Sequence, residues 1–348
     1  MSNATLARRT TIAVKINGTE VTEDANKYLI GMTYTDHEEG KTDDLQLALD
    51  DREGVWLHNW LDSDGGTKGA EISAIIIQKN WESTGHDRIL DCGEFEIDSL
   101  GSSSPPASVT IKGTSLPFTS AVRTATHTRA WEAITLKAIA GEIARNSGMI
   151  LMFESAFNPL YDRKEQVELS DIVFLEGLCY NAGISLKVTG GFIVLFDAAD
   201  YEKKPAITKI RHGEANVLNA RFDTSTNDSN YAHCHVSYTD PQTGRTIEYT
   251  FTAPGADPEG QTLKINERVT TREEARNLAM RRLRQKNKGE TKAAFSLTGD
   301  TRLVSGVTIE VEGWGMFDGK YIIAAATHGV NSGGYTVQTK LRRVLEGY

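Results

Sequence analysis

The first 115 residues are dominated by short segments in which apolar and polar side chains alternate. Thr11 to Ile16 alternates in this way and ends at Asn17-Gly18, a dipeptide that favours the tight turn of a β-hairpin. Because successive side chains of a strand face opposite sides, each such segment predicts a strand with one buried face. Further strands are expected at residues 20–22, 45–49, 71–78, 88–97 and 108–112. This spacing predicts a small β sandwich or barrel.

Between about residues 120 and 200, apolar residues recur every three or four positions, which is typical of helices. The first predicted helix ends at Gly148, and its apolar face is made of Trp131, Ile134, Ala138, Ile139 and Ile143. The second begins at Ser170 as N-cap and ends at Gly183, with an apolar face of Phe174, Leu175, Leu178 and Cys179. Apolar strands follow at 149–153, 184–188 and 192–196. The region is therefore predicted to be a small α/β module.

From about residue 206 strands prevail again, at 219–222, 232–238, 246–252, 291–297, 307–311, 321–326 and 335–341. One helix is expected at 271–288, where Thr271 and Glu274 form a capping box. The predicted fold class is mainly β with an α/β insertion. We expect domains at 1–110, 111–205 and 206–348, and the run from Gly101 to Pro106 is typical of a linker.

Charge and composition narrow the possible functions. The 348 residues carry 38 Lys and Arg against 47 Asp and Glu, a net charge of −9. This balance argues against a protein whose main task is to wrap duplex DNA or to cling to anionic lipid. The longest apolar runs, such as Met149 to Phe153, are far shorter than the roughly 20 residues that cross a bilayer. No signal peptide is recognisable, so synthesis and residence in the cytoplasm are expected.

An acidic stretch lies between Tyr34 and Gly54. Its carboxylates are Asp36, Glu38, Glu39, Asp43, Asp44, Asp50, Asp51 and Glu53. Paired carboxylates can serve a glycosidase as acid and base. Leu45, Leu47 and Leu49 have a period of two, however, which favours a strand with one buried face beside solvated acidic residues. Asp62 to Gly65 begins like a calcium loop but lacks the later ligands.

Other candidate sites are weaker. His233 and His235 face the same side of one predicted strand and form at most half of a metal site, so hydrogen-bonded strand histidines are favoured. The run from Gly313 to Gly319 leads into a strand rather than a helix, which indicates a hairpin and not a phosphate loop. The three cysteines are far apart and are expected to be buried thiols: Cys92, Cys179 and Cys234. We assign no catalytic, cofactor-binding or metal-binding residue and expect no enzyme activity.

The helix predicted at 271–288 is strongly basic. Its cations are Arg272, Arg276, Arg281, Arg282, Arg284, Lys286 and Lys288. DNA binding is one interpretation. No second helix precedes it at helix-turn-helix spacing, which favours a helix packed on this chain or on an acidic neighbour.

Taken in order, several segments resemble the late control D family, the baseplate hub proteins of contractile phage tails. They include "DDLQLALDDREGVWLHNWL", "CGEFEIDSL", "TLKAIAGEIA", "SDIVFLEGLCYNAGISLKV", "VSYTDPQTG", "TREEARNLAMRRLRQKNKGETKAAFSLTGD" and "GWGMFDGKYIIAAATHGVNSGGYTVQTKL". The resemblance runs from about residue 10 to 345 and extends to the hub part of type VI secretion spike proteins. After residue 270 it rests on a capped helix, a Gly-Asp strand junction, an aromatic-glycine hairpin and a final strand pair.

This resemblance implies a structural protein with two β domains similar to tail-tube subunits. It implies a homotrimeric ring with the tail tube above, a separate spike protein below, and baseplate wedge and tape-measure proteins nearby, without cofactors and without stable nucleic-acid or membrane binding. The ring would lie in the virion tail baseplate after assembly in the bacterial cytoplasm. Some acidic residues between 36 and 53 are expected to face the channel or a basic neighbour. Two alternatives stay open: a peptidoglycan hydrolase of the tail tip, and a nucleic-acid binder acting through helix 271–288.

Overall fold

The computed structural model describes residues 7–60, 69–115, 125–189, 191–225, 230–241 and 243–348. The predicted class, mainly β with an α/β insertion, is confirmed, with 52% of residues in strands and 19% in helices. Within the described ranges, no helix combines the length and the apolar character needed to cross a membrane.

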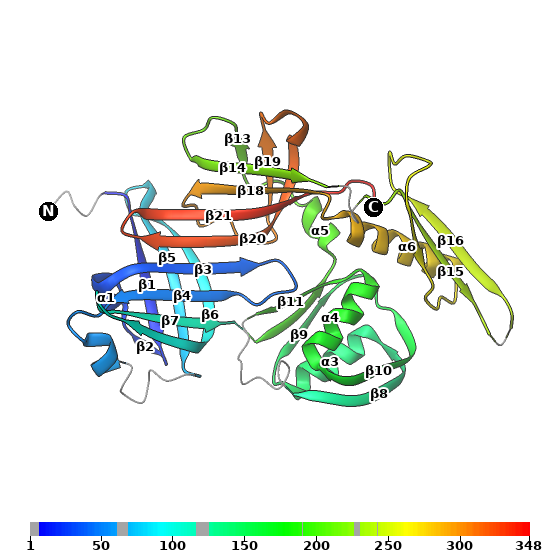
Figure 1. Cartoon of the computed structure of the whole chain (residues 1–348), viewed down its shortest axis with the longest axis horizontal. Coiled ribbons are helices and arrows are strands. Elements are labelled where there is room, and N and C mark those ends of the chain that lie inside the picture. The colour runs from blue at the N-terminus through cyan, green and yellow to red at the C-terminus, as the bar shows by residue number, and fades with distance from the viewer. Residues whose placement is uncertain (1–6, 61–68, 116–124, 190, 226–229, 242) are drawn as a thin grey trace.

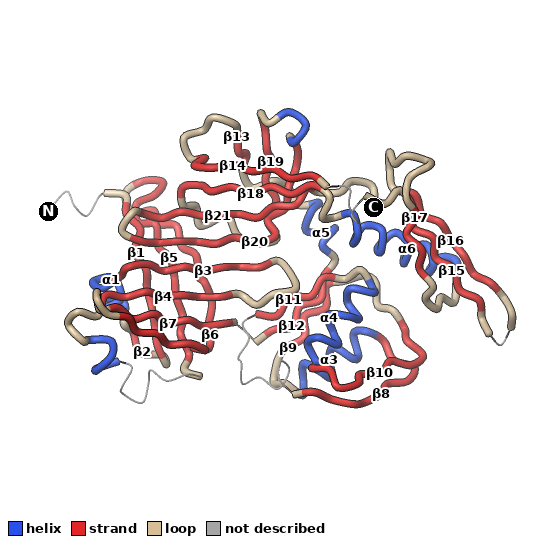
Figure 2. Tube along the Cα trace, viewed as in Figure 1, coloured by secondary structure: helices blue, strands red, loops and turns tan. Residues whose placement is uncertain are grey.

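One 13-stranded sheet, here called the main sheet, dominates the molecule (Figures 1 and 2). Its path is β14 (Val217–Thr224), β18 (Thr291–Thr298), β21 (Gly334–Arg343), β20 (Gly319–Asn331), β3 (Leu29–His37), β4 (Asp44–Asp50), β7 (Ser108–Thr114), β6 (His86–Ser103), β5 (Glu71–Ser83), β1 (Arg9–Ile16) and β2 (Thr19–Glu20). Beside this path, β19 (Thr308–Glu312) pairs with β20 and with β13 (Lys209–Arg211). The β-rich first and last regions of the chain therefore share one sheet.

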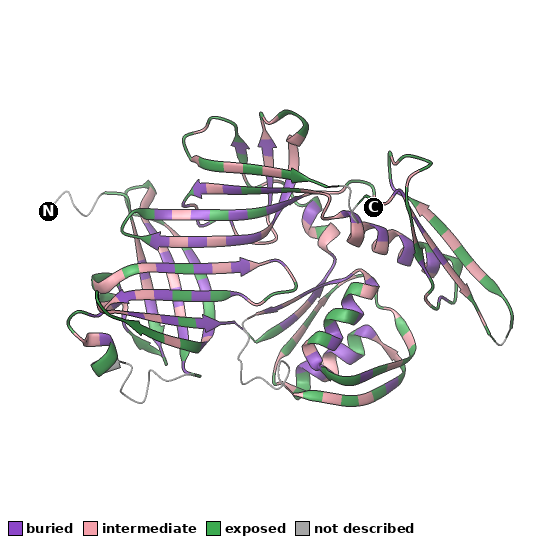
Figure 3. Ribbon diagram, viewed as in Figure 1, coloured by how far each residue is buried: buried purple, intermediate pink, exposed green. Residues whose placement is uncertain are grey.

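The two regions meet where β3 pairs with β20 in antiparallel register, with Thr35 opposite Thr327. In Figure 1, β1, β5 and β6 cross behind β20, β3 and β4, so the sheet folds over on itself. A single hydrophobic cluster fills the space and includes Leu47 of β4, Ile76 of β5 and Val337 of β21. Buried and exposed residues alternate along these strands in Figure 3, and the buried leucines predicted on β4 are confirmed.

The first hairpin is confirmed, but its second strand is shorter than expected. Asn17 and Gly18 adopt positive φ at the turn, and β2 ends at Glu20. The chain then forms α1 (Thr22–Tyr28) instead of continuing as a strand. The side chain of Asn26 accepts from the N–H of Ile12 at 3.1 Å and donates to its carbonyl at 2.6 Å. The amide side chain thus forms hydrogen bonds to the backbone of β1 in place of the longer β2 that was predicted.

The predicted linker from Gly101 to Pro106 is wrong. β6 extends to Ser103 and β7 begins at Ser108, with these two residues paired in register. Their hydroxyls are also 2.8 Å apart. The glycine, serine and proline residues form the tip of a long hairpin because the ladder between the two strands continues up to it.

The α/β module (residues 126–196) has a core of its own. Its elements are β8 (Thr126–Thr135), α3 (Leu136–Asn146), β9 (Ile150–Glu154), β10 (Leu160–Ser170), α4 (Asp171–Ala182), β11 (Ser185–Thr189) and β12 (Phe192–Phe196). The sheet β11-β12-β9 lies against the two helices, while β8 and β10 pair separately. The short helix α5 (Ala198–Lys203) leads back to the main sheet.

The start of the first predicted helix is wrong. Trp131 and Ile134 belong to β8, where they pair with Lys164 and Tyr161 of β10. The helix α3 begins only after Thr135, whose hydroxyl accepts from the N–H of Ala138 at 3.3 Å. The spacing of apolar residues could not reveal this, because β10 was not predicted and it alone makes the segment extended.

The main sheet and the α/β module are two layers of the molecule. A third layer lies at the far end of the molecule from the N-terminus (Figure 1). The small sheet, β16 (Thr246–Thr252), β15 (His233–Thr239) and β17 (Thr262–Ile265), packs on α6 (Arg272–Asn287). The capping box of α6 is confirmed at Thr271, whose hydroxyl accepts from the N–H of Glu274 at 3.1 Å. Strands of the last region thus divide between two sheets, and the ranges 1–110, 111–205 and 206–348 stay predictions about independent folding.

Candidate functional site

Half of the eight carboxylates in the acidic stretch are buried within the chain instead of being solvated. Four of its carboxylates are at most 6% exposed: Asp36, Glu38, Asp43 and Asp51. Asp51 accepts a hydrogen bond from the N–H of Trp56 at 2.7 Å, and the other three lie in ion pairs. The expectation that the acidic residues are solvated is therefore wrong for these four, while the expectation that some residues of the stretch face a channel or a basic neighbour stays a prediction about the others. Asp44 and Glu53 are exposed.

These ion pairs join the main sheet to the α/β module and to α6, and we call the set the ionic junction. Its members are Asp36, Glu38, Glu39, Asp43, Lys187, Glu202, Arg284, Lys288 and Arg342. They come from the end of β3, the loop after it, β11, α5, α6 with the residue that follows it, and β21. The junction therefore lies where all three layers of the molecule meet.

Lys187 of β11 forms the first half of the junction. Its ammonium lies 2.6 Å from Asp36 and 3.4 Å from Asp43. Asp36 also accepts from the N–H and the hydroxyl of Ser305 at 2.7 Å each, and Asp43 accepts from the hydroxyl of Thr189 at 3.0 Å. Burial opposes the charge of Lys187, but the two carboxylates outweigh it and raise the pKa of the ammonium. Burial also raises the pKa of Asp43, which Lys187 offsets only in part.

Arg342 of β21 forms the second half, between the carboxylates of Glu38 and Glu202. Its Nη2 lies 2.8 Å from Oε1 of Glu38, and its Nη1 pairs with Glu202. Arg284 of α6 reaches the same carboxylate at 2.5 Å. Burial raises the pKa of Glu38 in spite of the attraction of Arg342. Since each charge has an opposite charge beside it, the arrangement is stable only while the layers stay together.

The basic side of α6 is used largely for docking within the chain. Arg281 pairs with Asp197 at 2.5 Å, and Arg282 donates to the side chain of Asn181 at 3.0 Å. Lys288 pairs with Glu39, whose pKa is lowered because this attraction outweighs burial. These contacts confirm a packed helix, and they occupy cations on which the nucleic-acid interpretation depended.

Close backbone contact reinforces this docking. Gly183, at the C-terminus of α4, has φ of +65° and packs on α6. A Cβ atom at this position would lie 2.6 Å from Cβ of Arg281. The glycine predicted as a helix stop is thus also the point at which the α/β module touches α6.

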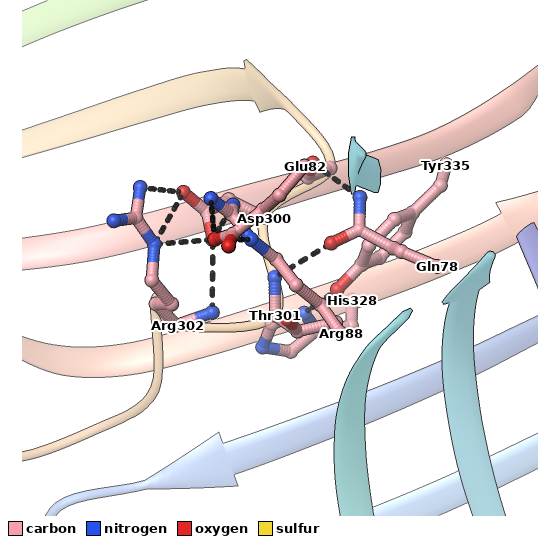
Figure 4. A network of polar contacts seen from close by, with 9 residues as sticks. Gln78, Glu82, Arg88, Asp300, Thr301, Arg302, His328 and Tyr335 are labelled. Carbon is pink, nitrogen blue, oxygen red and sulfur yellow. Dashed lines mark hydrogen bonds and ion pairs between the residues drawn. The ribbon is translucent and has the colours of Figure 1, made fainter. Parts of the chain in front are cut away.

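A second polar network closes the fold of the main sheet (Figure 4). The side chain of Gln78 on β5 is fully buried, donates to the carbonyl of Gly299 at 3.0 Å and accepts from the N–H of Thr301. Nearby, Arg88 of β6 pairs with Glu82 at 2.8 Å and lies 3.5 Å from Asp300. These contacts tie β5 and β6 to the segment after β18, across the folded sheet.

Gly299 and His328 show how tightly this region is packed. A Cβ atom on Gly299 would lie 2.0 Å from the ring of Tyr335, so no larger residue fits without displacement. Nδ1 of His328 is 2.7 Å from the hydroxyl of Tyr335, and burial lowers the pKa of the histidine to about 4. Sequence reasoning missed this network; its only signal was the Gly-Asp junction at residues 299–300.

The remaining candidates behave as structural residues. His233 and His235 lie 2.9 and 2.8 Å from the hydroxyls of Thr252 and Thr250. Across the described ranges, no three His, Cys, Asp or Glu side chains gather as metal ligands would. All three cysteines are buried, and the run from Gly313 to Gly319 joins β19 to β20 as predicted. The calcium-like segment from Asp62 to Gly65 lies outside the described residues.

No protein-family model matches this chain, and a search of curated protein sequences finds no match either. Solved structures do match. The 43 kDa tail protein of prophage MuSo2 from Shewanella oneidensis superposes with a TM-score of 0.66 at 17% identity, covering 96% of this chain and 98% of that one. A tail protein from Neisseria meningitidis MC58 gives 0.67 at 10% identity, covering 96% and 97%.

A component of the type VI secretion system from E. coli, described as structurally similar to the T4 tail proteins gp27 and gp5, gives a TM-score of 0.57 at 14% identity. The match covers 96% of this chain and 78% of that one. All three similarities extend over nearly the whole of this chain. The fold predicted through the resemblance to baseplate hub proteins is confirmed, and the chain has the fold of phage tail proteins and of a type VI secretion component.

Proposed function

We propose that this chain is a structural baseplate hub of a contractile phage tail or a tail-like particle. Three copies form a closed ring that joins the tail tube to the central spike. The observation that carries the proposal is the agreement in fold with a prophage tail protein over 96% of this chain and 98% of the other. If the two proteins had only one domain in common, the superposition would cover only part of at least one chain.

The distribution of charged groups supports a mechanical rather than a catalytic role. The buried carboxylates of the acidic stretch are paired with Lys187 and Arg342 or, at Asp51, bonded to the backbone. A hydrolase needs two carboxylates that face a substrate across a cleft. Here the paired carboxylates hold three layers in fixed relative positions, which a part that transmits force between tube and spike requires.

The partners follow from the same role. We propose that the ring contacts the tail tube on one face and a separate spike protein on the other, with wedge and tape-measure proteins beside it. The place of action is the tail baseplate, after assembly in the cytoplasm of the bacterial host. The chain itself makes and breaks no covalent bonds.

Mass photometry tests this proposal. The purified chain is measured alone and together with the tube and spike proteins of the same gene cluster. We expect a species of three times the chain mass of 38.2 kDa, alone or on addition of the partners. A chain that stays monomeric and binds neither partner contradicts the proposal, and so does release of cell-wall fragments by the purified protein.

A further inference from the structure

β16 is an outer strand of the small sheet, and no neighbouring strand among the described residues pairs with its outer edge. It pairs with β15 over seven residues without a register shift, and it lies at the margin of the molecule in Figures 1 and 2. It contains no proline or lysine. Natural sheets commonly protect such edges, because a free edge accepts another strand. Elsewhere in this chain β14 has a register shift and the ion pair of Arg221 with Asp223, and β2 is only two residues long.

The backbone groups on this edge point outward at alternate residues. Asp240 donates its N–H to the carbonyl of Arg245 at 2.9 Å, and Ala253 donates to Ala232 at 2.8 Å. These two bonds bracket the ladder and fix its phase, so the odd-numbered residues of β16 bond to β15. The N–H and C=O groups of the even-numbered residues, Thr246, Glu248 and Thr250, therefore point away from the sheet.

A groove follows the same edge. It has a volume of about 720 Å³ and is lined by residues 245–250, by His235 of β15, and by residues 270–272 at the start of α6. Ile247 and Tyr249 are half-buried on the α6 side and give the groove an apolar wall. The guanidinium of Arg272 lies 5.8 Å from the ring centre of Tyr249. A strand laid in this groove would find outward backbone groups on one side and an apolar surface on the other.

The charge of the groove indicates which kind of strand it binds. Arg245 and Arg272 line it, and neither has a carboxylate partner in the part of the chain that the structure describes. Glu248 is the acidic residue among the lining side chains. Two other arginines of α6 do have acidic partners: Arg281 pairs with Asp197, and Arg284 pairs with Glu202. Two unpaired guanidinium groups beside a free strand edge favour an occupant with carboxylates.

We propose that the free edge of β16 binds an extended acidic segment of a partner protein, which adds to the small sheet as a fourth strand. Main-chain hydrogen bonds to Thr246, Glu248 and Thr250 give the affinity, and Arg245 and Arg272 select an acidic sequence. The inference does not depend on the ring, because it rests on the small sheet of a single chain.

The probe is a fluorescein-labelled eight-residue peptide of alternating glutamate and valine, and its binding to the full chain is followed by fluorescence anisotropy. We expect saturable binding that falls at least tenfold in Glu248→Pro, which removes one outward N–H. It should fall several-fold in Arg272→Gln and stay unchanged in Arg221→Gln, the matched arginine control on β14. A peptide with lysine in place of glutamate should not bind.

Two further measurements test the proposal if Glu248→Pro fails to fold. Methylating the peptide nitrogens at one alternate set of positions should abolish binding, while methylating the other set should leave it intact. Hydrogen exchange on the complex should slow at the amides of Thr246, Glu248 and Thr250 and stay constant at Ile247 and Tyr249. Equal effects of the two methylated sets, equal binding of the lysine peptide, or self-association of the chain that depends on Glu248 would each overturn the proposal.

Discussion

His328 is fully buried in the main sheet and makes the stability of the protein depend on pH. Burial lowers its pKa to about 4, whereas the unfolded chain has an ordinary value of about 6.5. Between these values His328 binds more protons in the unfolded chain, so its contribution to the free energy of unfolding falls as the pH drops from 6.5 toward 4. The slope reaches about 1.4 kcal/mol per pH unit.

Urea unfolding at pH 4.5, 5.5, 6.5 and 7.5 measures this slope. His328→Gln should flatten the profile in that window, whereas His86→Gln, at an exposed position, should keep the wild-type slope. An unchanged profile in His328→Gln would show that another group carries the dependence.

Arg342 is the residue on which the second half of the ionic junction depends. It is 6% exposed and faces both Glu38 and Glu202. Replacing it with methionine keeps most of the volume but removes its positive charge from between two buried carboxylates, with Arg284 alone remaining beside Glu202. We expect Arg342→Met to lower the free energy of unfolding by about 3 to 5 kcal/mol.

Chemical denaturation of the variant checks this value. The matched control is Arg221→Met, which breaks an exposed pair with Asp223 and should cost no more than about 1 kcal/mol. A similar loss of unfolding free energy in both variants would mean that burial of the junction does not add to stability.

At the scale of elements, the packing of α4 on α6 can be separated from backbone strain. Gly183 and Gly148 both follow helices and have φ of +65° and +69°, but a Cβ atom at Gly148 would meet nothing within 4 Å. We expect Gly148→Ala to cost about 1 kcal/mol, the price of a left-handed conformation for alanine. Gly183→Ala should cost a further 1 to 3 kcal/mol, because its Cβ would overlap Arg281. Thermal unfolding of both variants gives the difference, and equal losses would contradict the helix contact.

The elements also show how far a sequence alone can go. Period-two leucines at 45, 47 and 49 and the box of Thr271 and Glu274 act over a few residues, and both were predictable. Trp131 was assigned to a helix because its extended state depends on β10, more than 25 residues away. Asp36 and Lys187 are 151 residues apart in the chain. The local sequence of the acidic stretch therefore could not indicate that Asp36 is buried. Contacts between residues that are distant in the chain could not be predicted from the sequence.

At the scale of the whole molecule, the connection of β3 to β20 decides which parts fold alone. Residues 126–205 contain a complete hydrophobic core, whereas the core of residues 1–115 is shared with β18, β20 and β21. We expect a fragment of residues 126–205 to give a cooperative thermal transition by circular dichroism. A fragment of residues 1–115 should fail to fold by the same measurement. A stable 1–115 fragment would instead support the predicted boundary at residue 110.

The pairing of Thr35 with Thr327 joins positions 292 residues apart. During synthesis the amino-terminal strands leave the ribosome long before their neighbour in the sheet exists, and at about 5 to 20 residues per second they wait for tens of seconds. Because residues 1–115 share their hydrophobic core with later strands, the apolar residues of β3 stay uncovered throughout that interval. Production of this protein should therefore depend on chaperones that shield nascent chains, and slower translation should lengthen the period of risk.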